Sequence, residues 1–243
     1  MSSPDRTGQD GAAPDDLYFL QLPVGEMENL AYAIGSRSTR EALLVDPAWS
    51  VDALLDRVEA DDMRVVGALV THYHQDHVGG SIFGMSIQGL DRLLARHPVP
   101  VHVQAREAEG VRRVTGISAS DLVPHEAGDV LALGRVRVRL LHTPGHTPGS
   151  QCFLVESEGA PGRLVSGDTL FLNGCGRVDL PGGDPEAMFR SLDGVLKRLP
   201  DETLLFPGHR YAPEPYAKMG DQKHTNPYLR AATVEQFLAF VGF

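Results

Sequence analysis

The chain is short of cysteine, of cationic side chains and of long apolar runs, and each shortage argues against a class of protein. Its two cysteines, Cys152 and Cys175, could form one bridge at most and do not suggest a secreted disulfide framework. Lysine and arginine number 22 against 32 aspartates and glutamates. The net charge of -10 argues against nucleic acid or an anionic membrane surface as the main partner. No apolar run approaches the ~18 residues of a membrane span.

The N-terminal stretch is polar and contains Gly, Pro, Asp and Ser. It lacks the basic-then-apolar order of a signal peptide, so we expect a cytoplasmic protein. Residues 1–16 are expected to form a frayed tail. Residues 17–243 fit one large α/β domain, because 42% apolar residues suffice for a sizeable core.

Apolar periodicity predicts short strands interspersed with amphipathic helices. Strands are predicted from apolar segments bounded by Gly, Pro and charge, at 17–22, 30–34, 42–45, 65–70, 99–103, 130–133, 136–141, 164–166 and 204–206. Helices are predicted from apolar residues at helical spacing, at 51–60, 90–96, 105–114, 185–199 and 234–240. Ser50 and Asp184 are the predicted N-caps of the first and fourth of these helices.

The densest group of metal-capable side chains follows the predicted strand 65–70 directly. It has the pattern His-x-His-x-Asp-His and consists of His72, His74, Asp76 and His77. Three imidazoles and a carboxylate so close together are what a borderline divalent cation such as zinc needs. A solvated histidine-rich loop is the alternative, but the preceding strand favours a metal site.

Three further metal-capable side chains follow predicted strands in the same manner. His146 lies in a turn stiffened by two prolines and two glycines, and Asp168 and His209 each follow a short apolar strand. The order of strand, small residue or proline, and ligand therefore occurs four times. This recurrence predicts an active site on one edge of the sheets. Histidines without partners at ligand spacing are interpreted as surface or structural residues: His97, His102 and His125.

Together these residues resemble the metallo-β-lactamase superfamily, over nearly the whole chain from about Leu17. The resemblance implies an αββα sandwich, in which two mixed sheets pack together with helices outside. It implies a first metal held by His72, His74 and His146. It implies a second metal held by Asp76, His77 and His209, with Asp168 bridging the two. Asp46 resembles the family's acid that orients a ligand histidine, and His142 is then structural, because His146 has the matching position.

Such a ligand set implies hydrolytic chemistry with two Zn²⁺ ions. Two divalent cations that share a carboxylate can lower the pKa of a bridging water toward neutrality. They can also stabilise the oxyanion that develops on a carbonyl substrate. Asp76 and Asp168 are the expected catalytic carboxylates, and Asp76 could carry a proton as well as bind metal. Cys175 has no base at readable spacing and is expected to be structural.

Within the superfamily, three segments resemble the hydroxyacylglutathione hydrolase (glyoxalase II) branch: 142–150, 166–171 and 174–177. This resemblance implies a metal-dependent hydrolase that cleaves a small-molecule thioester. The expected substrate-binding residues are Arg177, Asp179 and Tyr211. Tyr216 and Lys218 could line the pocket mouth beside Tyr211.

Two departures from that branch bear on glutathione recognition. The glutathione hydrolases carry a basic residue and, two positions later, a tyrosine, whereas this chain has Arg177 and Asp179. They also continue into a helical C-terminal domain, whereas this chain ends soon after His209.

Two alternatives remain open. The segments 174–179 and 225–230 resemble the persulfide dioxygenases, which hold one Fe²⁺ with the equivalents of His72, His146 and Asp168. A mixed Fe/Zn centre is a further alternative. Similar stand-alone hydrolases cleave acyl thioesters from acyl carrier proteins of polyketide-type pathways. A nuclease or a non-catalytic binding module is disfavoured, because the chain is short and acidic and no ligand is missing. A monomer or a homodimer is expected.

Overall fold

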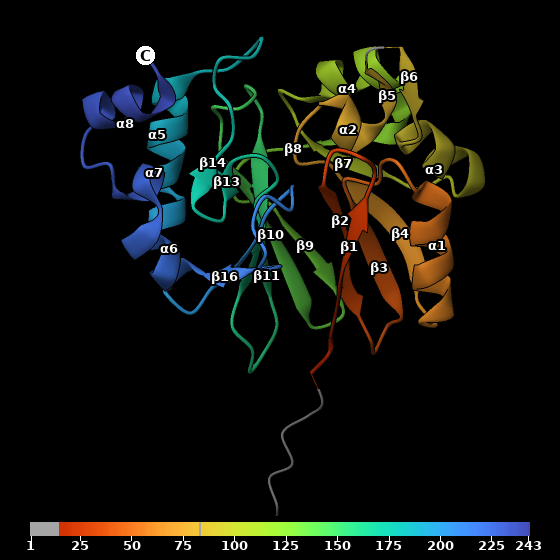
Figure 1. The fold of residues 1–243 in the computed structure, drawn as a ribbon. Helices are drawn as coiled ribbons and strands as arrows, with labels where there is room; N and C mark the ends of the chain where they lie inside the picture. The colour runs from red at the N-terminus through yellow and green to blue at the C-terminus, as the bar shows by residue number, and fades with distance from the viewer. Residues whose placement is uncertain (1–14, 83) are drawn as a thin grey trace, which may run out of the picture.

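The computed structural model describes residues 15–82 and 84–243, in which two six-stranded sheets pack face to face with helices on both outer faces (Figure 1). This arrangement confirms the predicted αββα sandwich. Of the expected tail, residues 1–14 lie outside the described residues. Asp16 is buried and accepts hydrogen bonds from Ser36 Oγ and the Ser38 amide (both 2.8 Å). Among the described residues, no helix has the length and hydropathy that a bilayer crossing demands.

The first sheet is mixed. Its first three strands pair antiparallel and the next three are added in parallel. In spatial order they are β1 (Leu17–Val24), β2 (Asn29–Ser36), β3 (Glu41–Val45), β4 (Arg64–Leu69), β7 (Val101–Gln104) and β8 (Leu122–His125). Its outer face is covered by α1 (Val51–Ala60), α3 (Leu90–Arg96) and α4 (Ala108–Thr115).

The second sheet is also mixed, because one pair, β12 and β15, runs parallel while its other pairs are antiparallel. In spatial order it contains β16 (Ala217–Lys218), β15 (Leu204–Phe206), β12 (Arg163–Val165), β11 (Gln151–Glu156), β10 (Val136–His142) and β9 (Val130–Leu133). The helices on its outer side are α5 (Pro185–Gly194), α6 (Met219–Thr225), α7 (Pro227–Arg230) and α8 (Val234–Val241).

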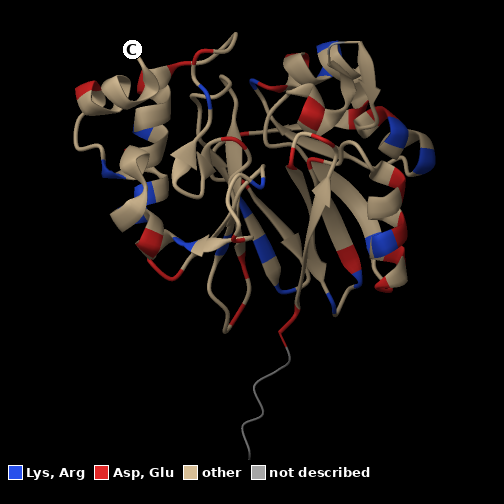
Figure 2. Cartoon of the chain, viewed as in Figure 1, with Lys and Arg blue, Asp and Glu red and all other residues tan. Residues whose placement is uncertain are grey.

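Three apolar layers hold this sandwich together. Side chains that alternate along the strands face either the opposite sheet or the helices, as period-two strands require. Between the sheets, Tyr32 and Ile34 of β2 pack with Val138 and Phe153 of the second sheet. Charged side chains lie mostly on the outer helices and at loop tips (Figure 2).

The strand β11 was not predicted, because it is buried along nearly its whole length and shows no alternation. Several other elements were not predicted either, and most of them are two- to four-residue segments that are too short for periodicity to reveal. They are α2 (Gln75–Val78), the hairpin β5 (Gly80–Ile82) and β6 (Met85–Ile87), the 3-10 turn Ala119–Asp121, β8, the hairpin β13 (Leu170–Phe171) and β14 (Gly174–Cys175), β16, α6 and α7. The helix predicted at 105–114 begins only at Ala108, because the preceding residues form a turn that directs Glu107 inward.

The helix predicted at 185–199 ends at Gly194 and continues as a 3-10 turn, Leu196–Arg198, because glycine is a poor helix former. Asp184 caps it as predicted, with its side chain accepting a bond from the Ala187 amide (2.9 Å). Ser50 occupies the predicted N-cap position of α1, but its side chain makes no capping hydrogen bond.

Substitution of Phe237 in α8 tests whether the C-terminal helix packs as part of the core. Its ring is fully buried and contacts those of Phe189 and Tyr228, with centroids 5.9 and 6.1 Å away. Phe237→Ala should lower the free energy of unfolding by about 3–5 kcal/mol in urea titrations of metal-free protein. Phe240, on the same helix, is 53% exposed, so Phe240→Ala should change it by about 0.5 kcal/mol or less. Equal losses would show that α8 does not pack as described.

Candidate metal centre

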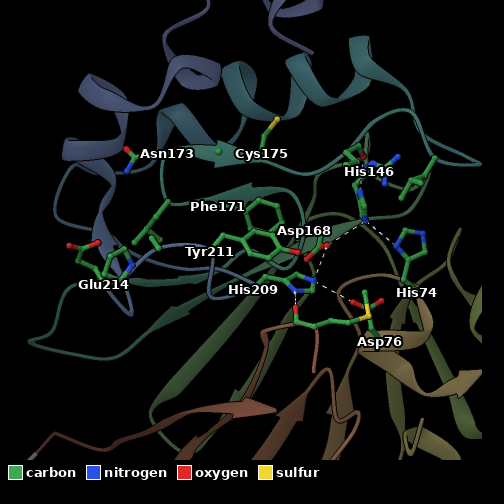
Figure 3. Close-up of a pocket in the computed structure, with 17 residues that line it drawn as sticks. His74, Asp76, His146, Asp168, Phe171, Asn173, Cys175, His209, Tyr211 and Glu214 are labelled. Carbon is green, nitrogen blue, oxygen red and sulfur yellow. Dashed lines mark hydrogen bonds and ion pairs between the residues drawn. The ribbon is translucent and has the colours of Figure 1, made fainter. Parts of the chain in front are cut away.

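The seven predicted ligands converge at one edge of the sandwich, where strands of both sheets end. Figure 3 labels five of them: His74, Asp76, His146, Asp168 and His209. The first sheet contributes the loop after β4 and the short helix α2. The second sheet contributes the segments after β10, β12 and β15. In chain order the ligands are His72, His74, Asp76, His77, His146, Asp168 and His209.

The first group consists of His72, His74 and His146. His74 Nδ1 lies 3.1 Å from His72 Nε2 and 3.0 Å from His146 Nε2. Three nitrogens placed about 2.0 Å from one tetrahedral ion would lie roughly 3.3 Å apart. The spacing therefore suits a single cation.

The second group consists of Asp76, His77 and His209. Asp76 Oδ2 lies 3.3 Å from His77 Nε2 and 3.4 Å from His209 Nε2, and the two nitrogens are 3.2 Å apart. Asp168 faces both groups. Its Oδ1 is 3.4 Å from His77 Nε2, and its Oδ2 is 3.3 Å from His209 Nε2 and 3.6 Å from His146 Nε2.

The donor atoms fit divalent cations. Asp168 Oδ1 is buried and has no hydrogen-bond partner among the described residues. A buried carboxylate oxygen without a partner costs free energy, and a cation between the two groups would offset that cost. Imidazole nitrogens with carboxylate oxygens form the donor set of zinc and of non-haem iron.

Several imidazoles are held from behind by acceptors on their outer nitrogen. Asp46 Oδ2 lies 2.9 Å from His77 Nδ1. Main-chain carbonyl oxygens serve the others: the Arg177 oxygen lies 2.7 Å from His146 Nδ1, and the Met27 oxygen 2.8 Å from His209 Nδ1. An acceptor at Nδ1 leaves the Nε2 lone pair directed at the centre.

Asp46 also fixes the start of the ligand loop. Its carboxylate accepts bonds from the Thr71 amide (2.8 Å) and the Thr71 hydroxyl (2.6 Å). Through these contacts Asp46 could orient a ligand histidine, which is the role that the resemblance implies for it.

Asn29 is a site residue that sequence reasoning missed. It is 2% exposed, and its Nδ2 donates to Asp76 Oδ2 at 3.0 Å. Trp49 Nε1 donates to the Asp76 carbonyl oxygen at 3.1 Å. Neither a lone asparagine at a strand start nor a tryptophan in a loop carries a sequence signal for this position.

In the metal-free protein the protonation of the histidines is divided between the two groups. Burial and neighbouring imidazoles lower the pKa of His72 well below its usual range and that of His74 to about 4. Burial also acts to lower the pKa of His77, but the carboxylates of Asp76, Asp168 and Asp46 outweigh it and raise the pKa well above its usual value. The same opposition raises the pKa of His209 to about 9.

A cavity of about 750 Å³ opens beside the centre. In Figure 3, Phe171, Asn173, Cys175 and Glu214 lie on the side of the cavity opposite His74 and Asp76. Apolar side chains make up much of the remaining wall: Met27, Leu172, Leu180, Ala212 and Pro213. The cavity can therefore take an apolar group of small-molecule size.

Only some of the expected substrate-binding residues line the cavity. Tyr211 lines the cavity and stacks on His209, with rings 4.9 Å apart and an interplanar angle of 11°. Arg177 lines it too, but its guanidinium forms two hydrogen bonds with Asp179 (2.9 and 2.8 Å). Asp179 is not among the lining residues. Neither are Tyr216, which packs on Phe206, and Lys218, which pairs with Glu202.

The remaining cysteines and histidines take no part in the centre. Both cysteines are free; Cys175 lines the cavity, but burial raises its pKa to about 12, so it is a protonated thiol. His102 Nδ1 lies 2.9 Å from His125 Nε2, and His125 Nδ1 lies 2.9 Å from Asp129. His142 Nε2 lies 3.1 Å from the Pro148 carbonyl oxygen.

Comparison with known sequences places the chain among metal-dependent enzymes. A model described as the metallo-beta-lactamase superfamily matches residues 24–209. A hydroxyacylglutathione hydrolase of Hahella chejuensis is 39% identical over 171 residues, which cover 70% of this chain and 58% of that enzyme. BaeB of Bacillus velezensis, a probable polyketide biosynthesis zinc-dependent hydrolase, is 29% identical over 212 residues, covering 87% and 86%.

Solved structures share the fold. ETHE1 from Myxococcus xanthus matches with a TM-score of 0.75 and 31% identity, over 93% of this chain and 90% of that one. A protein crystallised in a di-iron-bound form matches with a TM-score of 0.66 and 31% identity, over 86% and 99%. The similar proteins thus include both a zinc-dependent hydrolase and a protein that binds two irons.

Metal uptake should release protons. His77 and His209 have raised pKa values, so both are protonated near neutral pH in the metal-free protein and must lose a proton to bind a cation. Calorimetry of Zn²⁺ binding in buffers of different ionisation enthalpy should detect about two protons released per chain. Because the raised pKa of His209 is about 9, metal affinity should increase as pH rises toward that value. Uptake without proton release would contradict these protonation states.

Proposed function

The chain belongs to the metallo-beta-lactamase superfamily, and we propose that it is a dinuclear metal-dependent hydrolase that cleaves thioesters. One observation carries this proposal: the carboxylate of Asp168 lies within 3.6 Å of histidines from both ligand groups. A shared carboxylate is what a two-metal centre needs.

His72, His74 and His146 would hold one Zn²⁺, and Asp76, His77 and His209 would hold the other. When bound there, the two ions supply Lewis acidity toward the substrate carbonyl and lower the pKa of water. The protein positions these donors in advance through Asp46, Asn29 and the two main-chain carbonyls described above. Preorganised donors cost no reorganisation when charge develops during the reaction.

Asp76 would bind the second ion as an ionised carboxylate. Its pKa lies far below the usual range: burial would raise it, but His77 and the hydrogen bonds from His209, His77 and Asn29 outweigh burial. The carboxylate is therefore ionised, as a metal ligand must be, and its Oδ2 faces the second group. Tyr211 stacks on one face of the His209 ring.

The shape of the cavity supports an acyl thioester as substrate. Its apolar wall, with Phe171, Leu172 and Leu180, would receive the acyl group next to the ligands. A thioester places its carbonyl between the acyl group and the thiol carrier, so the carrier would extend past Arg177 and Tyr211 toward solvent. Glutathione and the pantetheine arm of an acyl carrier protein both have the required thiol. The relatives include a hydroxyacylglutathione hydrolase and a probable polyketide biosynthesis zinc-dependent hydrolase.

A persulfide dioxygenase is the second candidate. Its single iron would need only His72, His146 and Asp168, and the fold is similar to that of ETHE1 from Myxococcus xanthus. The second ligand group does not decide between the two, because its equivalents also survive in the dioxygenases. The segments 146–150 and 167–171, which resemble the hydrolase branch, favour the hydrolase.

Metal content and product together test the proposal. Protein purified without added metal should contain about two divalent ions per chain, with zinc predominant. It should release thiol from S-lactoylglutathione or from an acyl-N-acetylcysteamine thioester. His209→Ala, which removes one second-group ligand, should reduce thiol release by at least about 100-fold. One iron per chain with oxygen uptake on glutathione persulfide, and no thiol release, would establish the dioxygenase instead.

The pairing of Arg177 with Asp179 makes a separate prediction about the thiol carrier. Asp179→Asn would free the guanidinium for a carboxylate of glutathione, so KM for S-lactoylglutathione should fall by up to about fivefold. KM for the uncharged N-acetylcysteamine thioester should not change. Glu202→Gln is a matched control, because Glu202 pairs with Lys218 away from the cavity. An equal effect of both substitutions, or equal effects on both substrates, would contradict this role.

A further inference from the structure

Glu107 is a buried carboxylate to which nothing above assigns a role. It is 0% exposed and lies directly before α4, in the turn that replaces the predicted start of that helix. Its side chain points away from solvent into the space between two ligand-bearing segments. Only hydrogen bonds, with no charged partner among the described residues, offset the cost of burying it.

Three donors converge on this carboxylate, and they come from two segments. Oε2 accepts a bond from the Tyr73 amide (2.8 Å), which lies between His72 and His74. Oε1 accepts bonds from the Thr147 hydroxyl (2.9 Å) and the Gly149 amide (2.7 Å), which follow His146. The side chain therefore links the segment after β4 to the segment after β10.

The surroundings keep Glu107 in this position. A Cβ atom on Gly149 would lie only 2.7 Å from Glu107 Cγ, so the close approach requires glycine there. The Tyr73 ring packs against Gly110 of α4 and lies under the Arg113 guanidinium, 5.6 Å from its centroid. The Tyr73 hydroxyl donates to the Pro181 carbonyl oxygen (3.1 Å).

Apart from Asp46, which also binds Thr71 next to His72, the two ligand groups have different supports. Asp46, Asn29 and the Met27 carbonyl contact Asp76, His77 or His209. Glu107 contacts none of these residues, and its three partners flank only the first group. Loss of Glu107 should therefore disturb one metal position and spare the other.

We propose that Glu107 is a positioning residue for the first metal position, holding His72 and His74 in register with His146 across the two sheets. A carboxylate is suited to this part because it is acceptor-only, and three donors point at it. Glutamine could satisfy the Thr147 and Gly149 donors with its oxygen, but would then turn its own NH₂ group toward the Tyr73 amide. The inference concerns metal binding and does not depend on which substrate the enzyme cleaves.

The test measures Zn²⁺ affinity by competition with a chromogenic chelator, in two backgrounds that each retain one ligand group. In His209→Ala protein, which retains the first group intact, Glu107→Gln should weaken Zn²⁺ binding by about 10–100-fold. In His74→Ala protein, which retains the second group, it should change the affinity by less than about threefold. Glu109→Gln is the matched control, because Glu109 lies two residues further on, in the first turn of α4, where its side chain is 77% exposed and pairs with Arg112. It should have no effect in either background.

Unfolding temperatures of the metal-free proteins, measured alongside, separate positioning from general stability. If Glu107 had only a structural role, Glu107→Gln would weaken Zn²⁺ binding equally in both backgrounds, and that outcome would overturn the proposal. Unchanged Zn²⁺ affinity in the His209→Ala background would also overturn the proposal. If Glu107→Gln does not fold, Thr147→Val decides, because it removes one donor from the carboxylate. Thr147→Val should weaken Zn²⁺ binding at the first metal position by about threefold to tenfold and leave binding at the second unchanged.

Discussion

The structure depends on one electrostatic constraint: five imidazoles and two carboxylates are crowded together beneath the protein surface. Donor atoms of neighbouring ligands lie 3.0–3.6 Å apart, and one carboxylate oxygen of Asp168 has no hydrogen-bond partner. Without a cation, these side chains can stay close together only if some of the histidines are neutral and others are protonated. The lowered pKa of His74 and the raised pKa of His209 reflect this division.

The αββα sandwich makes the crowding possible because each sheet contributes part of the centre. Four ligands follow a strand of the first sheet and three follow strands of the second. Each ligand group combines residues from both sheets, so the apolar layer between the sheets determines the distances between members of one group. Well-packed interiors resist deformation, so the fold can hold charged groups at short distances without rearranging around them.

Around this centre, the groups that do not bind metal do much of the orienting. Carboxylates, carbonyls and one amide side chain face the outer atoms of the ligands or of the loops that carry them. The cavity differs in character, with an apolar wall and an arginine already paired to an aspartate. Under the proposed function, the metal centre would carry out the chemistry and the wall of the cavity would select the substrate.

The sequence by itself determined the class of fold and predicted the seven candidate ligands. His72, His74, Asp76 and His77 lie within six residues after an apolar strand, and the other three ligands follow strands of the same kind. Such local patterns are readable because neighbours in sequence stay neighbours in space. Only the tertiary structure revealed Asn29, Glu107 and the Met27 carbonyl, whose contacts join residues 47, 34 and 182 positions apart. It also decided that Arg177 pairs with Asp179 and that Tyr216 and Lys218 do not line the cavity. These contacts depend on how the two sheets and their loops pack, and no periodicity in the chain records that packing.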